Sequence, residues 1–213
     1  MNLKQMFIKF NYGTRNLPND TIKYIVIHDT GNTSAGANAL MHYNYFNGGD
    51  RQSSADFFVD KDQVIQVVDY TKNYSWNCGD GGGAYGITNR NSIGIEMCIP
   101  SDGDFAKTLT NTIELVAFLI DKLKLTNVAV VRHYDASRKN CPASLSSNSW
   151  AGWATFKQKL IDFQDNKLFV DIMNKYAYSP SYWIDNTVAG KTVDPTWVRA
   201  IILKIYRGVK SGI

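Results

Sequence analysis

Short apolar runs that alternate with helix-like segments are the feature of this sequence that most constrains its fold. The runs at residues 21–27, 92–99 and 127–131 are rich in β-branched and apolar side chains, which favour strands. Runs on either side of residues 60–63 predict a hairpin. Apolar side chains at helical spacing predict helices at 35–46, 106–124 and 149–163. This alternation is typical of an α/β domain, so we expect a mostly parallel or mixed β-sheet.

Two parts of the first 163 residues carry no such pattern. Residues 1–20 are predicted to be irregular, with Gly13 and Pro18 as turn residues. Residues 71–91 are predicted to be a long loop with five glycines between Gly79 and Gly86. A long loop inside a compact domain is usually functional. Trp76 in this loop is either a core side chain or one wall of a substrate groove.

Potential zinc ligands stand where two of the predicted strands end. His28 follows the first run and His133 follows the run at 127–131, with Cys141 eight positions later. Either histidine alone is more often a structural residue, but both beside a cysteine favour a metal site with three ligands and one open position, the geometry of catalytic zinc. Cys98 is a rival thiolate ligand. His42 lies inside a predicted helix and is not counted as a ligand.

A carboxylate interrupts the apolar strand at residues 92–99. The chain has two glutamates, and Glu114 lies on the polar face of a predicted helix. Glu96 instead lies in the apolar strand, where a buried carboxylate is costly unless it has a partner or a task. Beside a metal site, such a group suits general-base hydrolysis.

Charge and cysteine content exclude several classes of protein. The net charge is +4 and no run of Lys or Arg exceeds two residues, which argues against nucleic acid as the partner. Three cysteines argue against a disulfide scaffold and favour folding in a reducing cytosol. No signal peptide or membrane-spanning run is evident, so we expect synthesis in the cytoplasm and no membrane insertion.

The residues after the 149–163 helix form a separate, more basic tail. Residues 164–167 are predicted to be a polar junction, followed by short helices at 168–176, 180–187 and 195–207. From residue 164 the tail has seven Lys or Arg and four Asp, a net charge of +3. It also has aromatic residues that look exposed, namely Tyr178, Tyr182 and Trp183. A module that binds anionic cell-wall polymers, a helical cap on the first domain and a dimerisation element all remain open.

Several spaced motifs in residues 20–163 resemble one family. They are His28-Asp29-Thr30-Gly31-Asn32, Trp76 with Gly79, Ser92-Ile93-Gly94-Ile95-Glu96, and His133 with Lys139-Asn140-Cys141-Pro142. Together they resemble the zinc-dependent N-acetylmuramoyl-L-alanine amidases, a family that includes phage lysins and is related to the peptidoglycan recognition proteins. The tail, in particular Ser179-Pro180-Ser181-Tyr182-Trp183-Ile184-Asp185-Asn186 and Gly190-Lys191-Thr192-Val193, is similar to small helical modules of clostridial and bacillar wall enzymes. The resemblance implies an α/β catalytic domain over residues 1–163, with a mixed β-sheet flanked by helices. It also implies a small all-helical module over residues 165–213 that binds the cell wall.

The resemblance also implies a role for individual residues. His28, His133 and Cys141 would hold Zn²⁺. Glu96 would act on the attacking water, and Lys139 would stabilise the reacting oxyanion. Thr30, Asn32 and Trp76 would contact the substrate. Two residues depart from the family pattern: Asn77 and Asp56 stand at positions where family members often have histidine. In the family these two positions line the substrate groove.

The function implied is cleavage of the amide between N-acetylmuramic acid and L-alanine in bacterial peptidoglycan. We expect a phage or prophage endolysin of a Gram-positive host, made in the host cytoplasm and acting on the wall after release. A non-catalytic peptidoglycan-binding protein and a zinc hydrolase of another amide are the alternatives.

Overall fold

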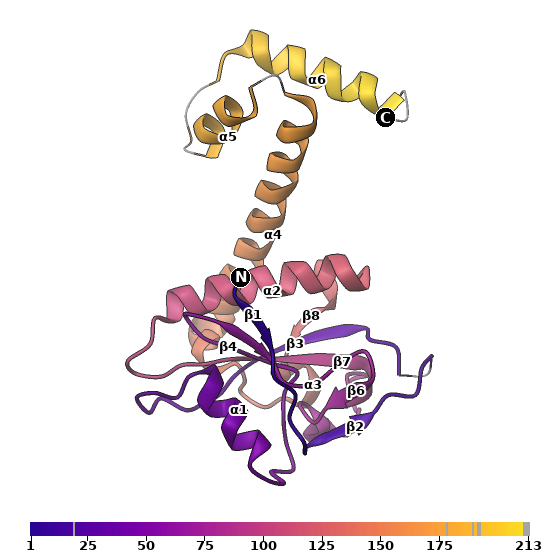
Figure 1. Cartoon of the computed structure of the whole chain (residues 1–213), viewed down its shortest axis with the longest axis vertical. Helices are drawn as coiled ribbons and strands as arrows, with labels where there is room; N and C mark the ends of the chain where they lie inside the picture. The colour runs from indigo at the N-terminus through magenta and orange to yellow at the C-terminus, as the bar shows by residue number, and fades with distance from the viewer. Residues whose placement is uncertain (19, 178, 189, 191–192, 211–213) are drawn as a thin grey trace. The chain divides into compact units, whose positions relative to one another are not determined.

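The computed structural model describes residues 1–18, 20–177, 179–188, 190 and 193–210. The chain divides into two compact units, Met1–Leu160 and Ile161–Ile213. The first unit contains the sheet and the second contains only helices among its described residues (Figure 1).

The first unit is built on a mixed six-stranded sheet, as the sequence predicts. Its strand order is β1-β5-β4-β7-β3-β8. The β4 and β5 strands form the predicted antiparallel hairpin, and the other neighbouring pairs are parallel. The strands, in sheet order, are Leu3–Gln5, Val64–Gln66, Phe57–Val59, Ser92–Met97, Tyr24–Asp29 and Val130–Arg132.

Helices cover both faces of this sheet, which explains why its central strands are mostly apolar. In β3 the side chains of Ile25, Val26 and Ile27 are all fully buried. Phe58 of β4 stacks on two side chains of α1. Figure 1 shows α2 along one face of the sheet and α1 and α3 on the other. The α-helices are Ala39–Asn47 (α1), Phe105–Leu123 (α2), His133–Ser137 (α3), Ser147–Tyr176 (α4), Pro180–Val188 (α5) and Pro195–Lys210 (α6).

The two segments predicted to be irregular contribute strands. β1 lies at the N-terminus and pairs with β5. β2 (Tyr12–Thr14) pairs with β6 (Asn73–Ser75) in a small antiparallel sheet, so the loop at 71–91 is shorter than predicted. Gly13 faces Tyr74 in this pair, and a Cβ at that glycine would lie 2.3 Å from the tyrosine ring. The prediction failed because such short pairs depend on a distant partner rather than on local periodicity.

Three element boundaries near the candidate site also differ from the predicted ones. β3 begins at Tyr24 and runs through His28 and Asp29, because β7 offers backbone partners up to Met97. α1 begins at Ala39, not at residue 35, because Asn38 caps it by accepting a hydrogen bond from Met41 N.

The residues after β8 form a helix that the sequence pattern did not indicate. The Asp135 carboxylate accepts from the backbone N–H of Arg132, which secures the first turn of α3. The helix ends at Ser137 and is capped by Arg138, whose φ of 68° is left-handed. His133 is therefore the first residue of a helix.

The predicted junction at residues 164–167 is wrong, because α4 runs through it. Residues 168–176 are the end of α4 and not a separate helix, while α5 and α6 match their predictions. Buried Met173, Trp183 and Ile201 form the core of the second unit. Trp183 is only 6% exposed, contrary to prediction, and Tyr178 lies outside the described residues. The boundary between the units, after Leu160, lies within α4.

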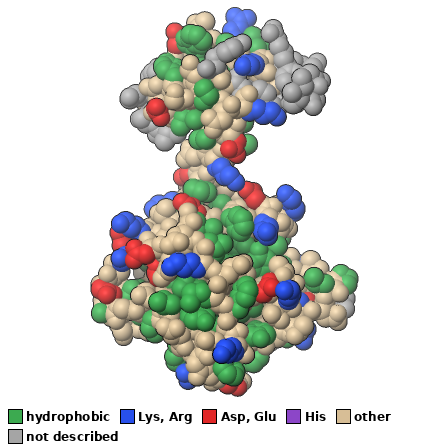
Figure 2. Space-filling view, viewed as in Figure 1, with side chains coloured by type: hydrophobic (Ala, Val, Ile, Leu, Met, Phe, Trp, Pro, Cys, Tyr) green, Lys and Arg blue, Asp and Glu red, His purple; other side chains and the backbone are tan. Residues whose placement is uncertain are grey.

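On the face of the first unit that Figure 2 shows, the described side chains form no patch of one charge. Basic and acidic side chains are interspersed on the visible face of the first unit in Figure 2. Among the described residues, none of the helices is both long and apolar enough to cross a bilayer.

Candidate functional site

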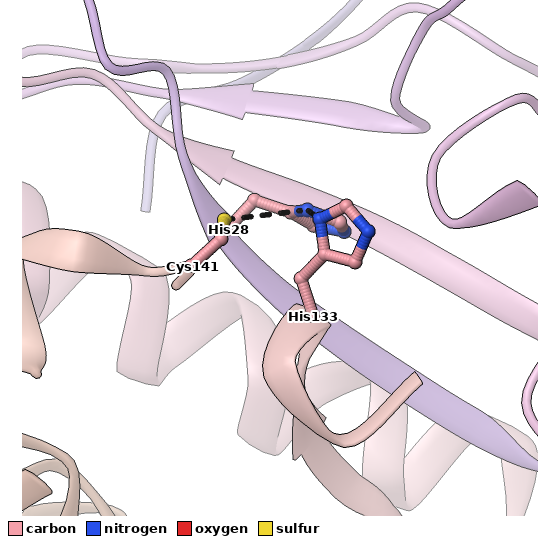
Figure 3. A group of neighbouring side chains, drawn as sticks. All are labelled: His28, His133 and Cys141. Atoms are coloured by element: carbon pink, nitrogen blue, oxygen red, sulfur yellow. Dashed lines mark hydrogen bonds between the residues drawn. The ribbon is translucent and has the colours of Figure 1, made fainter. Parts of the chain in front are cut away.

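Three potential metal ligands from different parts of the first unit meet at the carboxyl end of β3. His28 comes from β3, His133 from the start of α3 and Cys141 from the segment after α3 (Figure 3). All three side chains are buried, and their donor atoms lie within 4.8 Å of one another. The His28 and His133 Nδ1 atoms are 3.1 Å apart, and Cys141 Sγ is 3.8 Å from His28 Nδ1.

Two of the three separations between these donors are close to those around a zinc ion. A tetrahedral ion with bonds of about 2.05 Å to nitrogen and about 2.3 Å to sulfur separates two nitrogens by about 3.3 Å, and nitrogen from sulfur by about 3.6 Å. Burial lowers the pKa of His28 well below its usual range, with further contributions from His133 and Lys139, so its imidazole is neutral as a ligand must be. Burial, with the nearby Glu96 carboxylate, raises the pKa of the Cys141 thiol to about 12. Metal binding would therefore release a proton from the cysteine.

Glu96 lies beside these donors because of the strand register. β7 pairs with β3 so that Glu96 is opposite His28, and neighbouring residues in a parallel pair point to the same face. Glu96 Oε1 is 4.0 Å from His28 Nδ1, and Oε2 is buried without a hydrogen-bond partner among the described residues. Burial, with the charge of Asp29, raises the pKa of Glu96 to about 8, although Lys139 opposes this rise. A carboxyl group with a pKa near neutrality suits proton transfer.

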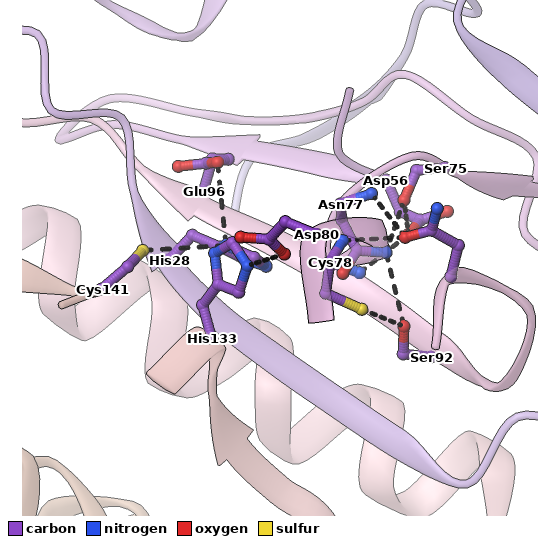
Figure 4. Close-up of polar contacts among 12 residues, drawn as sticks. His28, Asp56, Ser75, Asn77, Cys78, Asp80, Ser92, Glu96, His133 and Cys141 are labelled. Atoms are coloured by element: carbon purple, nitrogen blue, oxygen red, sulfur yellow. Dashed lines mark hydrogen bonds and ion pairs between the residues drawn. The ribbon is translucent and has the colours of Figure 1, made fainter. Parts of the chain in front are cut away.

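Asp80 is a site residue that the sequence did not single out. Its Oδ1 lies 2.8 Å from His133 Nε2, the nitrogen that does not face His28 (Figure 4). Asp80 belongs to the short 3-10 helix η1 (Gly79–Gly81) in the glycine-rich loop. The only signal in the sequence was the unusual length and glycine content of that loop.

An open cavity of about 470 Å³ adjoins the donor cluster. It is lined by Gln52, Ser53, Trp76, Asn77, Gly79, Asp80, Asn89, His133 and Lys139. The structure therefore brings two predicted residues, Trp76 and Lys139, to one cavity with the potential metal ligand His133. Two other predicted contacts, Thr30 and Asn32, follow β3 and are not among the lining residues. The Thr30 hydroxyl is buried without a hydrogen-bond partner among the described residues.

Asp56 does not line the groove, contrary to the expectation from the family pattern. It is fully buried, and its Oδ2 accepts hydrogen bonds from Ser75 Oγ at 2.6 Å and Gly94 N at 2.8 Å (Figure 4). Asn77 lines the cavity, and its amide donates a hydrogen bond to Ser75 Oγ. Ser75 in turn donates to Asp56, so Asn77 and Ser75 link the cavity wall to this carboxylate. The Asp56 side chain is thus part of a buried network behind the cavity wall.

The rival thiolate, Cys98, lies away from the donor cluster. Its sulfur is 3.8 Å from His42 Nδ1 and packs in the core beside α1. His42 is buried, stacks on Phe58 and also contacts the Asn38 carbonyl oxygen. Cys141 is the cysteine that the fold brings to the two histidines.

Comparison with known proteins agrees with this geometry. The model of the N-acetylmuramoyl-L-alanine amidase family matches residues 18–144, which include the three donors, Glu96 and Lys139. The chain belongs to this family. The resemblance seen in the sequence motifs is thereby confirmed for most of the first unit.

Individual members of the amidase family are similar over the same extent. The N-acetylmuramoyl-L-alanine amidase XlyA of Bacillus subtilis (strain 168) is 36% identical over 157 residues, which are 74% of this chain and 50% of XlyA. The solved catalytic domain of XlyA is 33% identical, with a TM-score of 0.63, over 75% of this chain and 99% of that domain. A mutant endolysin from Bacillus subtilis is 36% identical, with the same TM-score and coverage. The chain spans about half the length of the curated relatives it matches.

Proposed function

We propose that this chain is a zinc-dependent hydrolase of peptidoglycan that cleaves the amide between N-acetylmuramic acid and L-alanine. The observation that carries the proposal is the cluster of His28, His133 and Cys141 with Glu96 beside it, at the edge of an open cavity. All four residues lie in the part of the chain that matches the amidase family.

The three donors would hold zinc and leave one coordination position for reactants. When bound, zinc supplies Lewis-acid polarisation of a carbonyl and makes a water molecule more acidic. The remaining steps belong to side chains of the chain itself.

Glu96 is the proton carrier. It takes a proton from the attacking water as the oxygen bonds to the amide carbon, and it returns this proton to the nitrogen as the C–N bond breaks. The products are the lactyl carboxylate of N-acetylmuramic acid and the free amine of L-alanine. Lys139 is exposed at the cavity and supplies positive charge for the oxygen that becomes negative in the tetrahedral intermediate.

Identification of the new chemical ends tests this reaction. Purified protein is incubated with Gram-positive cell walls, and the new amino termini are labelled and identified. We expect new alanine amines without new reducing sugars, loss of the reaction after chelation, and its return with zinc. Binding to walls without new ends would favour the non-catalytic alternative, and new amines of a different residue would favour hydrolysis of another amide. Glu96→Gln is the matched control, because it keeps the side-chain shape and should lose about 10²-fold or more in turnover.

We also propose that the chain serves as an endolysin that reaches the wall of a Gram-positive host after release from the cytoplasm. The support is its likeness to amidases of Bacillus, one of which is described as an endolysin. Induced expression in the cytoplasm should leave cells intact until a membrane pore is opened, and then lyse them. Lysis without a pore would refute this route.

The second unit is proposed to bind the cell wall. Tyr182 is 43% exposed and Trp197 is 54% exposed, which suits stacking on sugars, and the unit carries excess positive charge. Full-length protein with Tyr182→Ala and Trp197→Ala should sediment less with walls but still hydrolyse soluble fragments. Phe118→Ala, at an exposed aromatic of α2, is the control. Equal sedimentation of wild type and of the protein with Tyr182→Ala and Trp197→Ala would refute the proposal.

A further inference from the structure

The glycine-rich loop presents one carboxylate to the back of a proposed metal ligand. Asp80 Oδ1 is 2.8 Å from Nε2 of His133, whose Nδ1 faces His28 across 3.1 Å. The two ring nitrogens of His133 therefore have different partners: one faces the donor cluster and the other faces a carboxylate. The His133 side chain is buried, whereas the Asp80 side chain is 47% exposed.

The loop is packed closely enough against α3 to fix this contact. A Cβ placed on Gly81 would lie 2.1 Å from the carbonyl oxygen of Ala136 in α3, so only glycine permits the approach. Cys78 is buried in a cluster with Ala136. The Asn89 side-chain oxygen accepts from the backbone N–H groups of Asn77 and Cys78, which holds the chain just before Asp80.

A second contact secures the far side of the loop. The Arg138 guanidinium, just after α3, lies 3.8 Å from the ring centroid of Tyr85. The loop is thus fastened to α3 on both sides of Asp80. This packing gives Asp80 a defined position although nearly half of its side chain is exposed.

We propose that Asp80 is a positioning residue that orients His133 for metal binding. By accepting a hydrogen bond from Nε2–H, the carboxylate selects the tautomer whose Nδ1 lone pair is free for a metal. It also fixes the ring plane and makes the imidazole a stronger donor. The inference rests on the proposed zinc site, and it gives the glycine-rich loop a task that is separate from contact with the substrate.

Zinc affinity is the measurement that tests this role. Partners of this kind typically change metal affinity by 10- to 100-fold. Wild type, Asp80→Ala and Asp80→Asn are compared by competition with a chromophoric chelator at pH 7.5. We expect Asp80→Ala to raise the zinc Kd by 10- to 100-fold. Asp80→Asn, which keeps an acceptor oxygen but loses the charge, should raise it less. Asp62→Asn removes an exposed carboxylate elsewhere in the same unit and should leave the Kd unchanged.

Two further readouts separate positioning from other roles. Cobalt(II) in place of zinc should give an altered absorption spectrum with Asp80→Ala, because the ring orientation changes. Urea unfolding of the metal-free Asp80→Ala protein should match wild type. If its zinc affinity falls only as far as its stability falls, the role is structural and the proposal is wrong.

A substrate contact would also be distinguishable. It would raise KM while leaving the zinc Kd within threefold of wild type, and that result would overturn the proposal. If Asp80→Ala fails to fold, Asp80→Asn decides through its zinc Kd and cobalt spectrum. If wild type itself does not bind zinc, the proposed metal site fails before any variant is compared.

Discussion

The buried carboxylate of Asp56 should make the stability of the first unit depend on pH. Burial raises the pKa of Asp56 from 3.8 to about 6, although hydrogen bonds from Ser75 and Gly94 and the charge of Arg15 partly oppose this rise. In the unfolded chain the group returns to its ordinary pKa. The rise corresponds to about 3 kcal/mol of unfolding free energy, at about 1.36 kcal/mol for each tenfold change in proton affinity.

The direction follows from which state binds more protons. Between pH 4 and 6 the folded protein keeps a proton on Asp56 that the unfolded chain has lost, so the free energy of unfolding falls as pH rises. The contribution is fully present below about pH 4 and is lost as pH rises through about 6. Asp56→Asn removes this titration while retaining an oxygen that can accept from Ser75 and Gly94.

Urea unfolding of metal-free protein from pH 4 to pH 7.5 measures this effect. Relative to wild type, Asp56→Asn should gain about 2 kcal/mol in unfolding free energy between the two ends of the range, because pH 4 lies close to the unfolded pKa. Other titrating groups contribute to both proteins and largely cancel in the difference. Asp62→Asn, at an exposed carboxylate, should give a difference that does not change with pH. Parallel curves for wild type and Asp56→Asn would refute the reasoning.

Three further outcomes are expected. Cys141→Ser should abolish or greatly weaken zinc binding, measured by metal content after dialysis, whereas Cys98→Ser should retain full zinc. The reverse pattern would show that Cys98, and not Cys141, is the zinc ligand. Lys139→Ala should lower kcat by about 10²-fold with zinc content unchanged, as for one lost oxyanion partner, and an unchanged kcat would remove Lys139 from the reaction. Phe156→Ala should lower the unfolding free energy by about 3–5 kcal/mol in urea titrations, because this side chain of α4 is fully buried, and a loss under 1 kcal/mol would contradict that burial.

The sequence predicted the parts of the candidate site that lie in apolar strands or directly after them. His28 directly follows one apolar run and Glu96 lies in another, and neighbouring parallel strands bring such residues together in the sheet. The pairing of Cys141 rather than Cys98 with the histidines was favoured by its short separation from His133, and the structure agrees.

Features that depend on distant or irregular contacts were not predictable. Asp80 reaches His133 only because Gly81 allows the loop to approach Ala136, and no periodic pattern reports such an approach. Asp56 was assigned to the groove by analogy with histidine at that position, but the smaller carboxylate is enclosed by Ser75 and Gly94. Trp183 looked exposed because the partners that bury it come from other helices of the second unit.

The direct pairing of His28 with Glu96 across β3 and β7 divides the site into two halves of different rigidity. Both residues stand on central strands whose neighbours are completely buried, so their amide protons should exchange with solvent only when the whole unit unfolds. Lys139 stands on an exposed segment at the rim of the cavity, and its amide can exchange through small local openings. The strands that hold the proton carrier are thus as durable as the fold itself, while the exposed segment that carries Lys139 can adjust to an incoming polymer without disturbing them.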